Sequence, residues 1–428
     1  MEKKIRWAAI QPLTGGAYLG TEEAIGHPAE WIMSFSELSK TTQKDGSIIS
    51  GGNEYYLLEY LKKKDREVPY YTIMHNMFEM DVDDVSPKIE CDGIEQTPNY
   101  DELDLVIGVP VCSGLSVVTR CSDKTKDLRN SNMQWMAKYT LTTIKPKVYI
   151  FENAPTLMSD RGDNLRYCFE QLAEECGYSI MYYKTDTILH HNCQKRPRTF
   201  VIFIKHLHDG IHETPPGFDF SADTMTLDEF LRQIPENTTC TEPIPMKLHN
   251  RYVISFIEHK FGKDWRATIH GNLMKYITNE SLLDELISYV EEDTTISDSE
   301  KEKPLQYFRH IKAKTSQGLN YYGDDIQYMV THMPSVQFRS MPNMLHLYED
   351  RIYNVREYLS FMGMPYDFDI NCRDYEKIGQ NVPVGTMKFM IEQILKHILY
   401  KWDSPRDTKQ NCMFQDNTKH SISVHYHK

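Results

Sequence analysis

LDLVIGVPVCSGLS occupies residues 103–116, an apolar run that passes directly into a turn carrying Pro110 and Cys112. A run of this length and composition is typical of a buried strand. Three similar runs follow, at residues 147–151 (KVYIF), 179–183 (SIMYY) and 199–204 (TFVIFI). Helices are expected between them, at residues 54–64, 131–144 and 164–176, with Gly177 closing the last. This alternation predicts a doubly wound α/β lobe with a mostly parallel sheet over residues 1–205.

The pattern changes after residue 205. Polar loops there separate short predicted helices, at residues 227–233, 251–261 and 281–291. We predict a second, smaller domain over 206–345, a helical section over 346–402 and a polar tail over 403–428. The acidic runs at 80–84 and 284–303 are interpreted as solvated surface.

Composition limits the class of protein. Hydrophobic residues make up 40% of the 428, and the sequence contains no apolar run of roughly 18 residues, so no membrane span is predicted. The nine cysteines lack paired close spacing, which favours a reducing cytoplasm and no metal site. We also expect a monomer. The net charge of −13 argues against a nucleic-acid partner only weakly, because an acidic protein can keep one basic cleft.

Reactive side chains stand beside three of the predicted strands. Cys112 follows the first strand and Glu152 ends the second. A Cys after a strand is placed for nucleophilic attack, although many cysteines are small buried hydrophobes. A carboxyl on a neighbouring strand end is placed for proton donation, although it can equally cap a helix. Arg196 and Arg198 precede the strand at 199–204 and, in extended chain, would point the same way or form a surface basic patch.

Together these segments resemble the DNA cytosine-5 methyltransferase family. GVPVCSGLS is similar to its Pro-Cys nucleophile motif, FENAP to its Glu-Asn-Val motif and QKRPR to its Gln-x-Arg-x-Arg motif. Five more segments match in order and spacing: PLTGGAYLG (12–20), SGGNEYYLLEYLKKK (50–64), DLRNSNMQWM (127–136), RIYNVREYLSFMGMPYDF (351–368) and YEKIGQNVPVGTMKFMI (375–391). The resemblance covers nearly the whole chain.

The resemblance implies a Rossmann-like, S-adenosylmethionine-dependent methyltransferase lobe with a smaller DNA-recognition domain. Its substrate would be carbon 5 of cytosine in double-stranded DNA, and its setting a bacterial or viral one. Cys112 would attack a flipped-out base, with Glu152, Arg196 and Arg198 around it. The implied donor-binding residues are Leu13, Thr14, Gly15, Gly16, Glu54, Asp83, Pro110, Asn381 and Val382. DNA contacts are predicted at Ser113, Gln194, Arg309, Lys312, Lys314 and Arg339.

Some positions depart from the family pattern. Val111 replaces the second proline before the Cys, and the aromatic that opens the glycine-rich loop is replaced around Gln11. Residues 379–382 read Gly-Gln-Asn-Val where Gly-Asn-x-Val is common. These departures leave open a modified sulfonium donor or weak binding of S-adenosylmethionine.

Other assignments also stay open at this stage. Glu37 competes with Glu54 for the donor ribose, and Asp81 and Asp84 compete with Asp83 for the adenine. The substrate could be RNA, or the chain could be a non-catalytic DNA-binding relative. A nicotinamide dehydrogenase is excluded because no GxGxxG follows the first strand.

Overall fold

The computed structural model describes most of the chain. The described residues are 4–35, 40–42, 48–50, 54–75, 81–110, 115, 130–207, 215–219, 223–236, 238–278, 280–319, 326–334, 343–402 and 413–418. Cys112, Ser113 and Arg339 lie outside them, as do Glu37 and Val111. Within the described part, no helix combines the length and apolar character that crossing a membrane requires.

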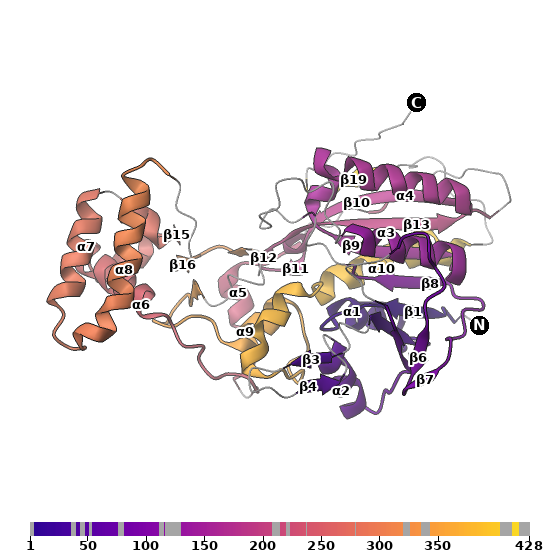
Figure 1. Ribbon diagram of the computed structural model, residues 1–428, viewed down its shortest axis with the longest axis horizontal. Coiled ribbons are helices and arrows are strands. Elements are labelled where there is room, and N and C mark those ends of the chain that lie inside the picture. Colours follow the sequence, from indigo (N-terminus) through magenta and orange to yellow (C-terminus); the bar gives the residue numbers. More distant parts are fainter. Residues whose placement is uncertain are drawn as a thin grey trace. The chain divides into compact units, whose positions relative to one another are not determined.

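The fold is organised around a large mixed sheet (Figure 1). Its order is β19 (Phe414–Asp416), β10 (Tyr178–Asp186), β13 (Pro197–Lys205), β9 (Val148–Asn153), β8 (Leu105–Gly108), β1 (Trp7–Ile10), β2 (Ile32–Phe35), β5 (Tyr70–Ile73), β6 (Ile89–Cys91) and β7 (Ile94–Glu95). The central strands β9, β8, β1, β2 and β5 are parallel to their neighbours in that block. The α/β architecture predicted from the sequence is confirmed.

The flanks of the sheet differ from the expectation. β13 runs antiparallel to both β9 and β10, and β6 runs antiparallel to β5 and β7. The predicted parallel pairing therefore holds for the centre of the sheet and for the edge pair β10 and β19. The reason that β13 is antiparallel is the connection after β10: Asp186 at its end pairs with Pro197 at the start of β13, and so short a link can join only antiparallel neighbours.

Both faces of the central strands are covered by helices. Val106 and Tyr149 belong to one apolar core with residues of α3 (Asn130–Tyr139) and α4 (Asp163–Cys176). On the other face, Trp7 packs on Tyr18 of α1 (Gly16–Ile25), with ring centroids 5.0 Å apart. Burial on two faces requires successive apolar residues rather than alternation, which explains the continuous runs in the sequence.

The predicted helices of the first lobe are confirmed. α2 spans Tyr55–Lys63, and α3 continues into a π-helical turn at Thr140–Ile144. α4 ends at Gly177, which adopts a left-handed conformation with φ 74° as expected for a helix-closing glycine. α9 (Val355–Phe361) and α10 (Val384–His397) form the helical C-terminal section.

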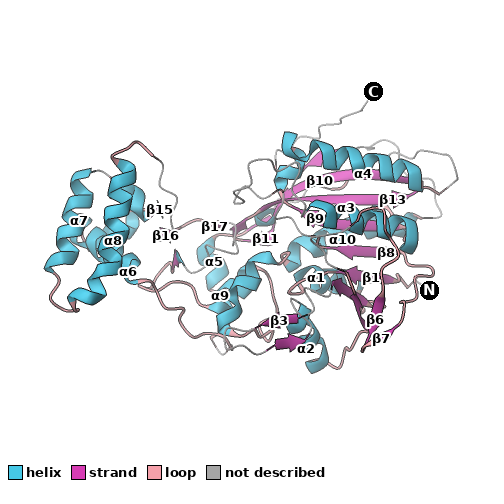
Figure 2. Cartoon of the chain, in the orientation of Figure 1, coloured by secondary structure: helices cyan, strands magenta, loops and turns pink. Residues whose placement is uncertain are grey.

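The chain divides into two compact units. Unit 1 comprises residues 1–225, 361–369 and 380–428, and unit 2 comprises 226–360 and 370–379. Unit 2 thus begins later in the chain, and ends later, than the second domain predicted over 206–345. Three helices of unit 2, α6 (Leu248–Phe261), α7 (Glu280–Glu292) and α8 (Asp298–Thr315), pack together, as Figure 2 shows.

The remaining elements are short. They are α5 (Leu227–Leu231), β3 (Lys40–Thr42), β4 (Ile48–Ser50), β11 (His190–Asn192), β12 (Gln194–Lys195), β14 (Asp223–Thr224), β15 (Gly271–Asn272), β16 (Gln327–Tyr328), β17 (Met333–Pro334) and β18 (Met344–Leu345). In unit 2, β15, β16 and β18 form a small sheet.

Helix α8 was missed by the sequence analysis. The run at 284–303 was interpreted as solvated acidic surface, and its acidic side chains are mostly exposed. The run also supplies the end of α7, which was predicted at 281–291, and the start of α8. The signal was present: Ser297 and Glu300 form a capping box at the start of α8, the Ser-x-x-Glu pattern that begins helices. Pro304 inside the helix works against that signal.

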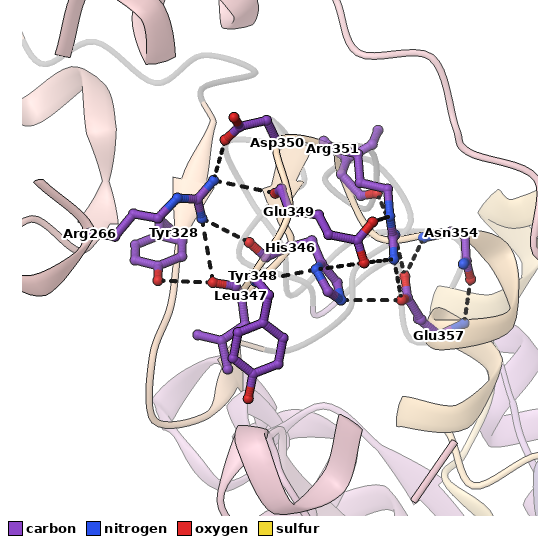
Figure 3. Close-up of polar contacts among 11 residues, drawn as sticks. Arg266, Tyr328, His346, Leu347, Tyr348, Glu349, Asp350, Arg351, Asn354 and Glu357 are labelled. Carbon is purple, nitrogen blue, oxygen red and sulfur yellow. Dashed lines mark hydrogen bonds and ion pairs between the residues drawn. The ribbon is translucent and has the colours of Figure 1, made fainter. Parts of the chain in front are cut away.

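A partly buried polar network stabilises unit 2 (Figure 3). The guanidinium of Arg266 lies 4.9 Å from the centroid of the Tyr328 ring and donates to the carbonyl of His346 at 3.0 Å. Arg351 donates two hydrogen bonds of 2.8 Å to the Glu357 carboxylate. Burial would raise the pKa of Glu357, but bonds from Arg351 and His346 outweigh it and hold the pKa at about 2. The segment that resembles the family's Arg-Glu stretch thus stabilises the fold through internal hydrogen bonds and ion pairs.

One buried histidine makes the stability of unit 1 depend on pH. His190 Nε2 lies 2.7 Å from Thr185 Oγ1, and its ring lies 4.4 Å from that of Phe389. Burial lowers the pKa of His190 to about 3, below the unfolded value of about 6.5. Protonation therefore favours the unfolded chain, so this stabilisation is complete above about pH 6.5 and is lost as the pH falls toward 3.

We expect His190→Gln to reduce this pH dependence. Between about pH 7.5 and 5.5 the free energy of unfolding should fall by about 1.4 kcal/mol less in the variant than in the unmodified protein. Urea unfolding at the two pH values measures the difference. An equal fall in both proteins would contradict the assignment.

Candidate active site

Three strands end side by side at one edge of the sheet. Ile10 at the end of β1 is in register with Gly108 at the end of β8, and Gly108 is in register with Phe151 of β9. β2 and β8 flank β1 on opposite sides, so the strand order reverses there. In open α/β sheets such a reversal opens a ligand-binding crevice beyond the carboxyl ends.

The structure brings Glu152 and Arg198 together at this edge. Arg198 Nε lies 2.6 Å from Glu152 Oε1, and the side chains are 18% and 7% exposed. Glu152 stands near the end of β9 and Arg198 near the start of β13. They meet because β13 is antiparallel to β9, with Phe200 opposite Glu152. A parallel β13 would have placed Arg198 at the opposite edge.

Arg196 takes different partners from Arg198. Its guanidinium is buried and donates from Nη2 to the backbone oxygen of Asn381 at 2.9 Å. Its backbone N–H donates to Asp186 Oδ1 at 2.7 Å. The sequence analysis missed Asp186, although an Asp at the start of a helical turn is a known cap signal. Burial raises the pKa of Asp186, and the bond from Arg196 opposes that rise.

Asn381 also holds the glycine-rich loop. Its Oδ1 accepts the N–H of Gly16 at 2.7 Å, and its Nδ2 lies 3.1 Å from Met364 Sδ. The contact requires glycine: a Cβ on Gly16 would lie 2.0 Å from the backbone oxygen of Val382. One turn along α1, a Cβ on Gly20 would lie 2.3 Å from the backbone oxygen of Val384. α10 therefore reaches α1 only because both positions lack side chains.

The glycine-rich loop itself has an unusual backbone. Gln11 and Leu13 have φ values of 53° and 54°, in the left-handed region that non-glycine residues seldom adopt. The N–H of Leu13 donates to Glu54 Oε1 at 3.2 Å. Glu54 is fully buried at the start of α2. This carboxylate therefore braces the loop directly.

Comparison with known proteins decides the family. The model of the C-5 cytosine-specific DNA methylases matches residues 57–396. The chain belongs to this family. The matched range contains Glu152, Arg196 and Arg198, and it begins after the glycine-rich loop. The chain is thus a cytosine methyltransferase that uses S-adenosylmethionine as methyl donor, as the sequence predicted.

Solved structures resemble this methylase at low identity. A prophage-encoded protein of E. coli, described as a DNA modification methyltransferase, is 13% identical over 92% of this chain and 99% of its own, with a TM-score of 0.48. The Entamoeba histolytica methyltransferase EhMeth is 11% identical over 92% and 99%, with a TM-score of 0.48. A Spodoptera frugiperda DNMT2 variant is 11% identical over 91% and 99%, with a TM-score of 0.44. No curated protein matched the chain.

The residues at the sheet edge of this methylase fit the donor. The crevice position beside β1 suits a nucleoside, and the buried carboxylate of Glu54 reaches the loop there, which is the chemistry that ribose hydroxyls require. Thr14, Pro110 and Val382 are buried around the same edge. Asp83 is largely exposed and pairs with Lys138 at 2.5 Å. Among the described residues, no cluster of His, Cys, Asp or Glu could hold a metal ion.

The predicted DNA contacts have varied surroundings. Gln194 is fully buried and donates from Nε2 to the backbone oxygen of Phe361 at 2.9 Å. Arg309 pairs with Glu291 at 2.8 Å. Lys312 pairs with Asp284, and Lys314 is half-buried near the end of α8. Ser113 and Arg339 lie outside the described residues, as does the nucleophile candidate Cys112.

The close approach of α1 and α10 predicts the effect of Gly16→Ala. The added Cβ meets a backbone oxygen that cannot rotate away, so we expect a loss of about 3 kcal/mol of unfolding free energy and weaker donor binding. Glu23→Ala is the control on the same helix, because within the described part of the chain Glu23 forms a single, largely exposed ion pair, with Lys388 at 3.4 Å. It should cost about 0.5 kcal/mol or less. Denaturant unfolding compares the two, and similar values would contradict the packing.

A substitution at Gln11 is expected to raise the free energy of unfolding, whereas Gly16→Ala lowers it. Its side chain is 1% exposed, and its Oε1 has no hydrogen-bond partner among the described residues. Gln11→Met should raise the unfolding free energy by about 1 kcal/mol, because an unpaired buried polar atom is removed. Gln393→Met is the matched control, since Gln393 Oε1 accepts the N–H of Asp219 at 2.9 Å and its loss should destabilise. A lower free energy of unfolding in Gln11→Met would contradict this interpretation of Gln11.

Proposed function

We propose that this methylase transfers a methyl group to carbon 5 of cytosine in double-stranded DNA, through a covalent adduct of Cys112 with a flipped-out base. The observation that carries the proposal is the Glu152–Arg198 pair at the carboxyl edge of the sheet. Pro110, buried at that edge, is two residues before Cys112 in the sequence. The proposal thus joins a nucleophile, a carboxyl and a guanidinium at one substrate.

Covalent attack solves a chemical problem of the substrate. Carbon 5 of cytosine is a poor nucleophile, so it cannot take an electrophilic methyl group unaided. In the proposed reaction the Cys112 thiolate adds to carbon 6, and the electron pair of the 5,6 double bond becomes available at carbon 5. S-adenosylmethionine, when bound, would supply the methyl group to carbon 5; its methyl–sulfur bond would break and S-adenosylhomocysteine would leave. A base then removes the carbon 5 proton, the 5,6 double bond re-forms and the Cys112 thiolate leaves.

Glu152 and Arg198 would hold the base during that sequence. A carboxyl can hydrogen-bond ring nitrogen 3 and the exocyclic amine, where charge develops as the thiolate adds. A guanidinium can hold the carbonyl oxygen at position 2. The existing Glu152–Arg198 contact of 2.6 Å keeps the two groups close enough to act on one pyrimidine. Arg196, bound to Asn381, would support the segment and favour the thiolate of Cys112.

Reaching the target atoms requires extrusion of the base from the duplex, at a cost of a few kcal/mol. We propose that unit 2 acts as the DNA-recognition domain and offsets that cost. Arg309 and Lys312 would exchange their exposed acidic partners for phosphates, which is an inexpensive exchange because surface ion pairs contribute little. Lys314, Arg339 and Ser113 complete the proposed contacts, whereas Gln194, predicted as a DNA contact from the sequence, is left out because it is fully buried and bonded to the backbone of Phe361.

Removal of the nucleophile tests the proposal. We expect Cys112→Ala to lower methyl transfer to duplex DNA at least about 1,000-fold and to abolish the denaturation-resistant adduct with 5-fluorocytosine DNA. Donor binding, measured by calorimetry, should be retained and shows that the variant is folded. Glu152→Gln should lower the rate about 100-fold or more.

The same assay distinguishes the proposed function from an RNA methyltransferase and from a non-catalytic relative. Transfer to transfer RNA but not to duplex DNA would assign an RNA substrate. An unmodified protein that binds donor and duplex but forms no adduct would be a non-catalytic relative. Bisulfite sequencing of DNA from expressing cells reports the base and its sequence context, and unmodified cytosines there would count against a DNA substrate.

A further inference from the structure

One residue connects the glycine-rich loop to the arginine segment of the candidate active site. Asn381 is 1% exposed. Its side-chain Oδ1 accepts the N–H of Gly16 at 2.7 Å, and its backbone oxygen accepts Nη2 of Arg196 at 2.9 Å. These three residues come from separate parts of the sequence, and all three belong to unit 1.

The connection has little room to relax. The peptide that follows Asn381 lies directly against Gly16, since a Cβ there would be 2.0 Å from the oxygen of Val382. The side-chain amide of Asn381 is also held from its nitrogen, which lies 3.1 Å from Met364 Sδ. Buried hydrogen bonds of this kind are costly to break, because a group left unsatisfied in the interior does not regain its bonds to water. A shift of the loop must therefore move Asn381 or break a bond.

The connection continues to the base-binding pair. Arg196 is anchored at its backbone by Asp186 and at its guanidinium by Asn381. Two residues later, Arg198 contacts Glu152 at 2.6 Å. The intervening Pro197 belongs to β13 and pairs with Asp186 of β10. The stretch from Arg196 to Arg198 is thus short and held on both sides, so its position follows that of Asn381.

We propose that Asn381 is a positioning residue that couples occupancy of the donor site to the geometry of the Arg196–Arg198 segment. Donor bound at the glycine-rich loop restrains Gly16, Gly16 restrains Asn381, and Asn381 restrains Arg196. Coupling of two sites is reciprocal, so loosening Arg196 must also weaken donor binding. The proposal rests on the proposed function in calling the Glu152–Arg198 pair the base site, and on the predicted binding of the donor at the glycine-rich loop.

Hydrogen exchange with S-adenosylhomocysteine as the probe tests the coupling without any nucleic acid. In the unmodified protein, saturating S-adenosylhomocysteine should slow amide exchange at residues 11–21 and also, about fivefold or more, at residues 194–200. In Asn381→Ala the slowing at 11–21 should persist and that at 194–200 should disappear. Asn381→Asp is the matched control: it keeps an oxygen acceptor for Gly16 and should keep the distant protection.

A second variant keeps the test decisive if Asn381→Ala fails to fold. Arg196→Met removes the guanidinium but leaves the Asn381–Gly16 bond intact. Calorimetry should show about fivefold or more weaker S-adenosylhomocysteine binding, the lower end of ordinary coupling energies. Unchanged affinity in this variant, or unchanged protection at 194–200 in Asn381→Ala, overturns the proposal. Because no nucleic acid is used, neither result bears on whether the substrate is DNA.

Discussion

The hydrogen bond from Gly16 to Asn381 is the contact around which unit 1 is arranged. It joins residues 365 positions apart in the chain and brings the start of α10 against the start of α1. The approach depends on glycine at positions 16 and 20, so a missing side chain determines the packing. The same asparagine then holds Arg196. In this methylase, helix α10 near the C-terminus therefore packs against helix α1 near the N-terminus and completes the catalytic lobe.

The direction of β13 is as important for the candidate active site as the bond between Gly16 and Asn381. Because β13 is antiparallel to β9, its first residues reach the edge where β1, β8 and β9 end. Arg198 can then face Glu152. The short link between β10 and β13 makes this direction necessary, since a parallel partner needs a long crossover. The length of the connection between two strands thus decides which charged groups meet.

The glycine-rich loop shows how this methylase accommodates its departures from the family pattern. Leu13 and Gln11 take left-handed conformations that glycine adopts more easily. The bond from the Leu13 N–H to buried Glu54 helps to hold that strained backbone. In this structure Glu54 supports the loop, whichever acid binds the donor ribose. Strain of this kind persists only where surrounding contacts fix the conformation.

The sequence by itself determined the family and the α/β lobe, and it supplied the candidate reactive residues. Those features depend on local patterns: apolar runs mark strands buried on both faces, and Cys112, Glu152, Arg196 and Arg198 lie beside such runs. Only the tertiary structure decided the mixed sheet and the partners of Asn381. These features depend on strand direction and on contacts between residues distant in the chain, because a local pattern carries no information about which remote segment will pack against it.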